Sequence, residues 1–137
     1  MKLDILAFAA HPDDVELSCS GTLIKHIRAG YKAGIVDLTA GELGTRGSTA
    51  IRQQEAARAS ALLGISVREN LGLKDGLFNV DEPGRIEVVK MIRKYRPEIV
   101  LANAVRDRHP DHGRASKLVS EACFLSGLPK LVTELNG

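Results

Sequence analysis

Short apolar runs alternate with helix-forming patterns along this 137-residue chain, and the alternation restricts the folds open to it. Unbroken apolar runs predict buried strands, because a strand covered on both faces carries apolar residues at successive positions. We expect four strands, over residues 3–9, 32–39, 69–73 and 98–102. Apolar spacing and glycine or proline stops predict helices over 15–29, 50–63, 81–95 and 113–125. The order predicts an α/β fold, a Rossmann-like doubly wound parallel sheet with helices on both faces.

The expected strand order decides which loops meet. In doubly wound sheets ligands bind outside the carboxyl ends of the strands, where the strand order reverses. A 3-2-1-4 order would place the strand at 3–9 beside the strand at 98–102, and their following loops would share one crevice. We expect residues 1–137 to form one domain. Because four strands make a small sheet and residues 128–137 resemble the start of another element, we also expect further residues to complete the natural fold, making this a C-terminally truncated version.

Three of the four histidines lie in two short clusters that follow these strands. One cluster is Ala10-His11-Pro12-Asp13-Asp14, and the other is His109-Pro110-Asp111-His112. Histidine and aspartate bind borderline divalent metals such as zinc. Either cluster alone is also typical of a turn or a helix cap. Together, each after a buried strand, they predict one metal site and a metal-dependent hydrolase.

The clusters contain enough groups for such a site. Catalytic zinc takes three protein ligands and keeps one position for a water molecule, which ionises near neutral pH. The expected ligands are His11, Asp14 and His112. The other members have expected supporting roles: Asp13 as general base, His109 beside the oxyanion or the leaving amine, and Asp111 as the group that orients a histidine.

A glycine-rich stretch, residues 41–47, follows one expected strand and precedes a helix. A phosphate-binding loop would lie there, but the stretch lacks the Lys-Ser/Thr of a P-loop and the GxGxxG spacing. Arg46 and Arg52 flank the start of that helix. Either arginine could bind an anionic or hydroxyl-rich substrate beside the metal, or simply face solvent. Asp75-Gly76 predicts a turn.

Composition excludes several classes of partner. The chain has 19 basic and 17 acidic residues, no basic run and few aromatic residues, so we expect no nucleic acid or membrane partner. No segment approaches the roughly 18 apolar residues of a membrane span, and the first apolar run is too short for a signal peptide. We therefore expect a cytoplasmic protein. Cys19 and Cys123 are expected to be free buried thiols.

The two histidine clusters and the loop at 41–47 resemble, in order and spacing, the signature of the LmbE-like, or PIG-L, zinc-dependent N-deacetylases. The resemblance extends from residue 2 to about residue 134. Glu69-Asn70-Leu71-Gly72 and residues 101–105 resemble the branch that deacetylates the bacillithiol precursor. The resemblance implies removal of an N-acetyl group from an N-acetylglucosamine derivative, N-acetylglucosaminyl-malate in that branch. It also implies a chain that continues past residue 137.

The resemblance also implies residue roles. It assigns zinc to His11, Asp14 and His112, the general base to Asp13, and assistance to the tetrahedral intermediate to His109, supported by Asp111. It selects Arg52 over Arg46 as the substrate-binding arginine. It implies an amino-sugar substrate as partner and a homo-oligomer, a hexamer in that branch. Three alternatives stay open: Fe²⁺ or another divalent ion in place of zinc, another conjugate such as an N-acetylated chito-oligosaccharide, and a non-catalytic metal- or nucleotide-binding module.

Overall fold

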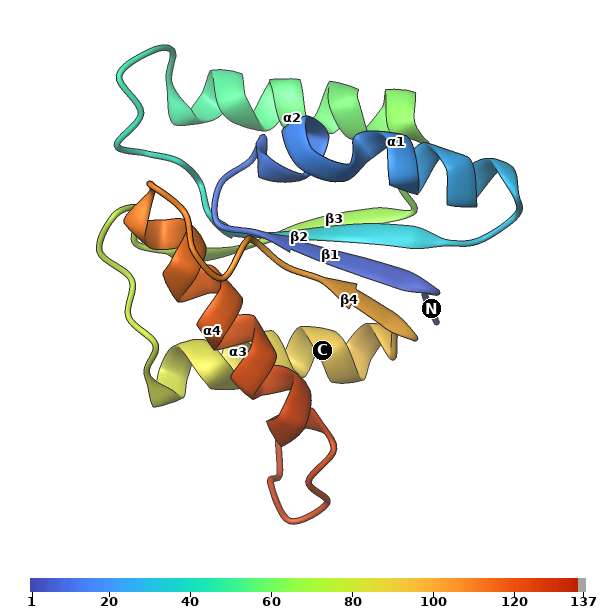
Figure 1. Cartoon of the computed structure of the whole chain (residues 1–137), viewed down its shortest axis with the longest axis vertical. Coiled ribbons are helices and arrows are strands. Elements are labelled where there is room, and N and C mark those ends of the chain that lie inside the picture. Colours follow the sequence, from blue (N-terminus) through green and yellow to red (C-terminus); the bar gives the residue numbers. More distant parts are fainter. Residues whose placement is uncertain (136–137) are drawn as a thin grey trace.

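Four parallel strands and four helices alternate along the chain, as the sequence predicts (Figure 1). The computed structural model describes residues 1–135. The elements are β1 (Ile5–Ala9), α1 (Asp14–Arg28), β2 (Ala33–Thr39), α2 (Thr49–Leu63), β3 (Val67–Leu73), α3 (Glu82–Tyr95), β4 (Ile99–Leu101) and α4 (Pro110–Ser126). The strand order is β3-β2-β1-β4, which confirms the expected 3-2-1-4 arrangement.

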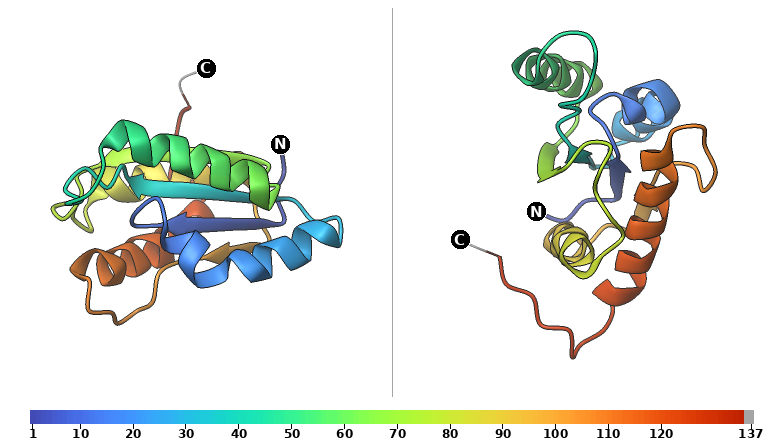
Figure 2. Two further views of the ribbon diagram at one scale, coloured as in Figure 1. Left: turned by 90° about the horizontal axis from the view of Figure 1, so that it is seen from above. Right: turned by 90° about the vertical axis from the view of Figure 1, so that its left-hand side faces the viewer.

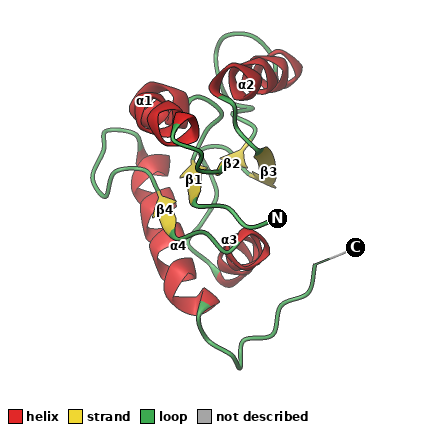
Figure 3. Cartoon of the chain, turned by 90° about the vertical axis from the view of Figure 1, so that its right-hand side faces the viewer, coloured by secondary structure: helices red, strands yellow, loops and turns green. Residues whose placement is uncertain are grey.

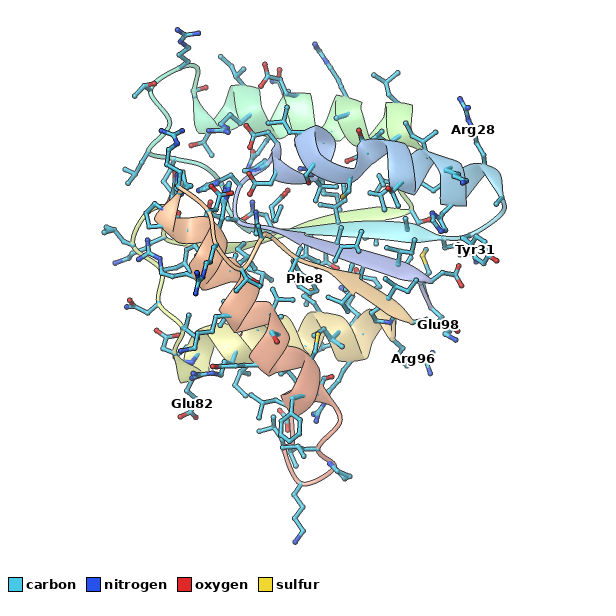
Figure 4. The ribbon with its side chains drawn as sticks, in the orientation of Figure 1. Phe8, Arg28, Tyr31, Glu82, Arg96 and Glu98 are labelled. Carbon is cyan, nitrogen blue, oxygen red and sulfur yellow. The ribbon has the colours of Figure 1, made fainter. Side chains whose placement is uncertain are left out.

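The sheet lies between two helical layers. Helices α1 and α2 cover one face, and α3 and α4 cover the other (Figures 2 and 3). Residues of β1 alternate between the two faces: Ile5 and Ala7 belong to the apolar cluster beneath α1, whereas Leu6 and Phe8 belong to the larger cluster beneath α3 and α4. Figure 4 shows Phe8 on that second side of the sheet. All five residues of β1 are buried because the strand is central and covered on both faces.

Some boundaries differ from the expected ones. Helix α4 begins at Pro110 rather than at 113, so Asp111 and His112 lie in its first turn and not in the preceding loop. Proline is favourable at that position because the first helical N–H groups have no partner within the helix. Strand β4 has only three residues, Ile99–Leu101. Both cysteines are free, and both are only partly buried. Among the described residues, no helix is both long and apolar enough to span a membrane.

A charged group ties α1, β2 and β3 together inside the fold. Asp37 of β2 is 3% exposed, and Arg68 of β3 donates two hydrogen bonds to it, from Nε at 2.7 Å and from Nη2 at 3.0 Å. Arg68 also donates from Nη1 to Glu16 of α1. Loss of the guanidinium would leave two acidic side chains without their cation, one of them fully inside the fold.

Replacing Arg68 with methionine should therefore destabilise the protein by about 3–5 kcal/mol, the usual result of removing one partner from a buried ion pair. Chemical denaturation monitored by circular dichroism measures the change. Arg58→Met is the matched control, because Arg58 lies exposed on α2. Equal stability of the two variants would show that the buried carboxylates do not depend on Arg68.

Candidate active site

Both histidine clusters meet at the carboxyl ends of β1 and β4, the end of the sheet that faces the viewer in the right-hand view of Figure 2. His11 follows β1, whereas His109 and His112 begin α4. The ring centroid of His11 lies 4.7 Å from that of His109 and 5.5 Å from that of His112. The strand order therefore brings together side chains almost a hundred residues apart in sequence, as the topology argument predicts.

Asp14 lies between the other two expected metal ligands. Its Oδ2 is 3.6 Å from His11 Nδ1, and its Oδ1 is 3.2 Å from His112 Nε2. Asn103, two residues after β4, donates from Nδ2 to Asp14 Oδ2 at 3.0 Å and fixes the carboxylate. Each of the two imidazoles thus presents a nitrogen to an oxygen of Asp14, and histidine with aspartate is a donor set suited to zinc or a similar divalent ion. The residues present therefore fit the expected metal.

His109 lies close enough to be a further donor. The ligand nitrogens of His11, His109 and His112 all lie within 4.8 Å of one another. The ring of His109 stacks on that of His112, with centroids 4.9 Å apart. The geometry thus accommodates His109 either beside the metal or at the substrate, and its assignment as the acid-side helper stays a prediction.

The pKa values of His11 and Asp14 are both shifted so that each group is charged near neutral pH. Burial alone would lower the pKa of His11, but Asp14, Asp111 and Asp75 outweigh it and raise the pKa to about 9. Burial alone would raise the pKa of Asp14, but hydrogen bonds from His11 and Asn103 and the charge of His112 lower it to about 2. Near neutral pH the group is thus a histidinium held by carboxylates. A divalent cation would take the place of the proton.

Asp13 occupies the N-cap position of α1 but makes no side-chain capping bond. Aspartate usually caps at that position, and the missing cap costs about 1 kcal/mol. The carboxylate instead accepts a hydrogen bond from Arg52 Nη2 at 3.3 Å and stays half exposed toward the pocket. The expected general base is therefore turned toward solvent and an arginine rather than toward its own helix.

The glycine-rich loop holds Arg52. Arg52 Nη1 donates to the carbonyl oxygen of Gly41 at 3.2 Å, and a Cβ atom at Gly44 would lie 2.6 Å from Nη1. The guanidinium therefore packs directly against the loop backbone, since glycine lets the side chain approach it. Arg46 is exposed on the same loop and does not line the pocket, whereas Arg52 does.

Asp111 contacts a different histidine from the one implied by the resemblance. Its fully buried carboxylate lies 3.0 Å from Nε2 of His11, and only its backbone N–H reaches His109, at Nδ1. The cause is the earlier start of α4, which turns Asp111 inward beneath the first cluster. Asp111 therefore contacts His11 through its carboxylate and His109 through its backbone N–H, and its support of His109 during a reaction stays a prediction.

Three residues of the site were not expected from the sequence. Asp75 lies 3.0 Å from His11 Nε2, Asn103 holds Asp14, and Asp107 Oδ2 lies 2.7 Å from His112 Nδ1. Asp75 was expected only in a turn. All three follow β3 or β4, so the strand-end rule that indicated His11 would also have indicated them. The resulting pocket has a volume of about 450 Å³, and Leu17 and Leu43 contribute apolar surface to it.

The fold and the site together define a class: α/β proteins with a histidine–aspartate centre at the carboxyl end of a parallel sheet. The PIG-L family, described as GlcNAc-PI de-N-acetylase, matches residues 6–123. This chain belongs to the PIG-L family.

Three relatives illustrate the similarity. Diacetylchitobiose deacetylase of Thermococcus kodakarensis is 33% identical, with 91% of this chain and 51% of the relative covered. A probable N-acetyl-alpha-D-glucosaminyl L-malate deacetylase 2 of Bacillus anthracis is 31% identical, with 86% and 58% covered. The crystal structure of a conserved protein from Thermus thermophilus, TT1542, is 43% identical with a TM-score of 0.92, with 98% and 61% covered. The chain thus spans between half and two thirds of the length of these proteins.

The charge state of His11 predicts how metal binding depends on pH. Because the ion must displace a proton from a group whose pKa is about 9, apparent Zn²⁺ affinity should rise about tenfold from pH 7 to pH 8. Competition with a chromophoric chelator measures the affinity of the metal-free protein at each pH. A histidine of ordinary pKa would already be neutral in this range, so an affinity that stays constant would contradict the prediction.

Substituting Gly44 with alanine should displace Arg52 without unfolding the chain. The added Cβ would lie 2.6 Å from the end of the Arg52 side chain and 3.2 Å from the Gly41 carbonyl oxygen, so we expect the contact with Asp13 to be lost while stability falls by about 1 kcal/mol. Nitrogen-15 NMR of the arginine side chains reports the displacement. Gly21→Ala is the control, because a Cβ there has no heavy atom within 4 Å. An unchanged Arg52 signal in Gly44→Ala would show that the packing of Arg52 against the loop backbone does not fix its position.

Proposed function

We propose that this protein is a metal-dependent deacetylase that removes the N-acetyl group of an N-acetylglucosamine derivative. The observation that carries the proposal is the meeting of His11, Asp14, His112 and the uncapped Asp13 in one pocket. Membership of the PIG-L family and the names of two relatives, both deacetylases, support it. Zinc is the proposed ion, with Fe²⁺ or another divalent ion as the alternative, because histidine and aspartate bind several of these metals.

In the proposed mechanism His11, Asp14 and His112 hold the ion. When bound, the ion supplies Lewis-acid chemistry that acidifies a water molecule and polarises the acetyl carbonyl. Asp13 accepts the proton of the attacking water, whose oxygen forms the new bond to the carbonyl carbon. The C–N bond then breaks, and Asp13 or His109 returns a proton to the departing amine. Acetate and the free amino sugar are the products.

Arg52 is the proposed substrate-binding residue. Two of its five N–H donors are engaged, by Asp13 and by the Gly41 carbonyl, and the others are available to hydroxyl or carboxylate oxygens. An anionic conjugate such as N-acetylglucosaminyl-malate suits this group, and an N-acetylated chito-oligosaccharide is the second candidate. A nucleotide-binding module is less well supported, because the glycine loop holds an arginine. A homo-oligomer and a cytoplasmic location stay predictions.

Acetate release tests the proposal. The zinc-loaded protein should release acetate from N-acetylglucosaminyl-malate or from diacetylchitobiose, and Asp13→Asn should lower kcat by about 10²–10⁴-fold with unchanged zinc content. Glu55→Gln, an exposed change on α2, is the control. Zinc binding without acetate release from either sugar would favour a non-catalytic metal-binding protein. Full activity of Asp13→Asn would exclude Asp13 as the base.

A further inference from the structure

Asp75 is a buried carboxylate that joins two loops of the site. It follows β3 and is 7% exposed. Its Oδ1 lies 3.0 Å from Nε2 of His11, and its Oδ2 accepts the backbone N–H of Leu43 at 2.9 Å. Its own backbone N–H donates to Oε1 of Glu42 at 2.8 Å. Asp75 therefore contacts the loop after β1 with one oxygen and the glycine loop with the other.

We propose that Asp75 is a positioning residue with two tasks, which are to keep Nδ1 of His11 free for a metal ion and to hold the glycine loop at that histidine. The inference rests on the metal site of the proposed function but not on its reaction.

The first task follows from the chemistry of imidazole. A neutral imidazole has one N–H, and the other nitrogen offers a lone pair. Asp75 and Asp111 both approach Nε2 of His11 at 3.0 Å, and ionised carboxylates only accept hydrogen bonds. When His11 loses one proton, as metal binding requires, the remaining N–H is therefore held at Nε2. The lone pair of Nδ1 then faces Asp14, where an ion would bind, which is the usual arrangement of a metal-binding histidine.

Asp75 is better suited to this task than Asp111, because the Asp111 carboxylate also accepts hydrogen bonds from other groups. Asp111 already accepts hydrogen bonds from the Gly76 backbone N–H at 2.8 Å and from Arg114 at 2.5 Å. Within residues 1–135, the only hydrogen-bond partner of Asp75 Oδ1 is His11. Without Asp75, the Nε2–H of His11 would have only Asp111 as its acceptor. The Asp111 carboxylate would then accept hydrogen bonds from His11, the Gly76 N–H and Arg114.

The second task follows from how little else holds the glycine loop. Residues 42–48 are exposed, and Leu43 has a side chain that is 64% exposed. Its amide nevertheless has a buried acceptor in Asp75. Because the same loop cradles Arg52, the position of this arginine depends on the carboxylate that orients His11. Metal and substrate groups are thereby placed relative to one another.

Two substitutions separate the tasks. In Asp75→Asn the side-chain oxygen must stay with the Leu43 N–H, so the NH₂ group faces Nε2 of His11 and opposes the required N–H. We expect Zn²⁺ affinity to fall about 10–100-fold while hydrogen exchange of the Leu43 amide stays slow. In Asp75→Ala both are lost: affinity falls and the Leu43 amide exchanges quickly. Chelator competition with Zn²⁺ alone and NMR hydrogen exchange measure the two effects.

Two control variants remove a carboxylate charge without touching His11. Glu42→Gln should leave Zn²⁺ affinity within about twofold of wild type. Asp107→Asn, beside His112, should lower the affinity but leave Leu43 exchange unchanged. Far-UV circular dichroism checks that each variant is folded.

Zn²⁺ affinity of Asp75→Asn equal to that of wild type would overturn the first task, and a slow Leu43 amide in Asp75→Ala would overturn the second. A wild-type protein that binds no Zn²⁺ would also overturn the proposal. Neither readout needs acetate. A protein that binds Zn²⁺ with these dependences but releases no acetate would refute the proposed reaction and leave the role of Asp75 intact.

Discussion

The pairing of β1 with β4 is the constraint on which the site depends. The backbone ladder is short, running from Ile5 opposite Ile99 to Ala7 opposite Leu101. Beyond it, Asn103 continues the connection with its side chain: Oδ1 accepts the Ala10 N–H at 3.0 Å, while Nδ2 donates to Asp14 at 3.0 Å. A single amide therefore joins the two loops just where the strands separate. Strand β1 is central and buried along its whole length, so it supports this junction firmly. The position of the junction in turn sets the positions of the histidines in the two loops.

Beside that junction, three largely buried carboxylates surround one histidine. Asp14, Asp75 and Asp111 all lie within hydrogen-bond or ion-pair distance of His11, whose pKa they raise to about 9. Like charges so close together are stable only with a cation among them. A proton on His11 supplies one positive charge among them. The same electrostatic demand favours a divalent ion at this position.

Sequence patterns predicted what depends on periodicity and strand ends: the strand order, the four helices and the meeting of His11 with His112. They did not predict the contacts that depend on the exact residue at which a helix begins, or on loops far apart in the sequence. Pro110 was assigned to a loop because the expected helix began at 113, and this hid the inward turn of Asp111. Asp75 was assigned to a turn because Asp-Gly is locally a turn signal, whereas its contact with His11 spans 64 residues. Residue pattern alone did not separate Arg46 from Arg52, because the difference is a tertiary contact: Arg52 reaches the Gly41 carbonyl and Asp13, whereas Arg46 stays exposed on the loop.

Arg52 links recognition to chemistry, because the group proposed to bind substrate also holds the proposed base. Its bond to Asp13 is 3.3 Å long and partly exposed, so it contributes modestly to stability and can be exchanged for another oxygen. A substrate carboxylate or hydroxyl at Arg52 would use the N–H donors that Asp13 and the Gly41 carbonyl leave free, and it would then lie beside the proposed base. By holding the guanidinium against the Gly41 carbonyl, the glycine loop places the proposed substrate-binding group beside the proposed base.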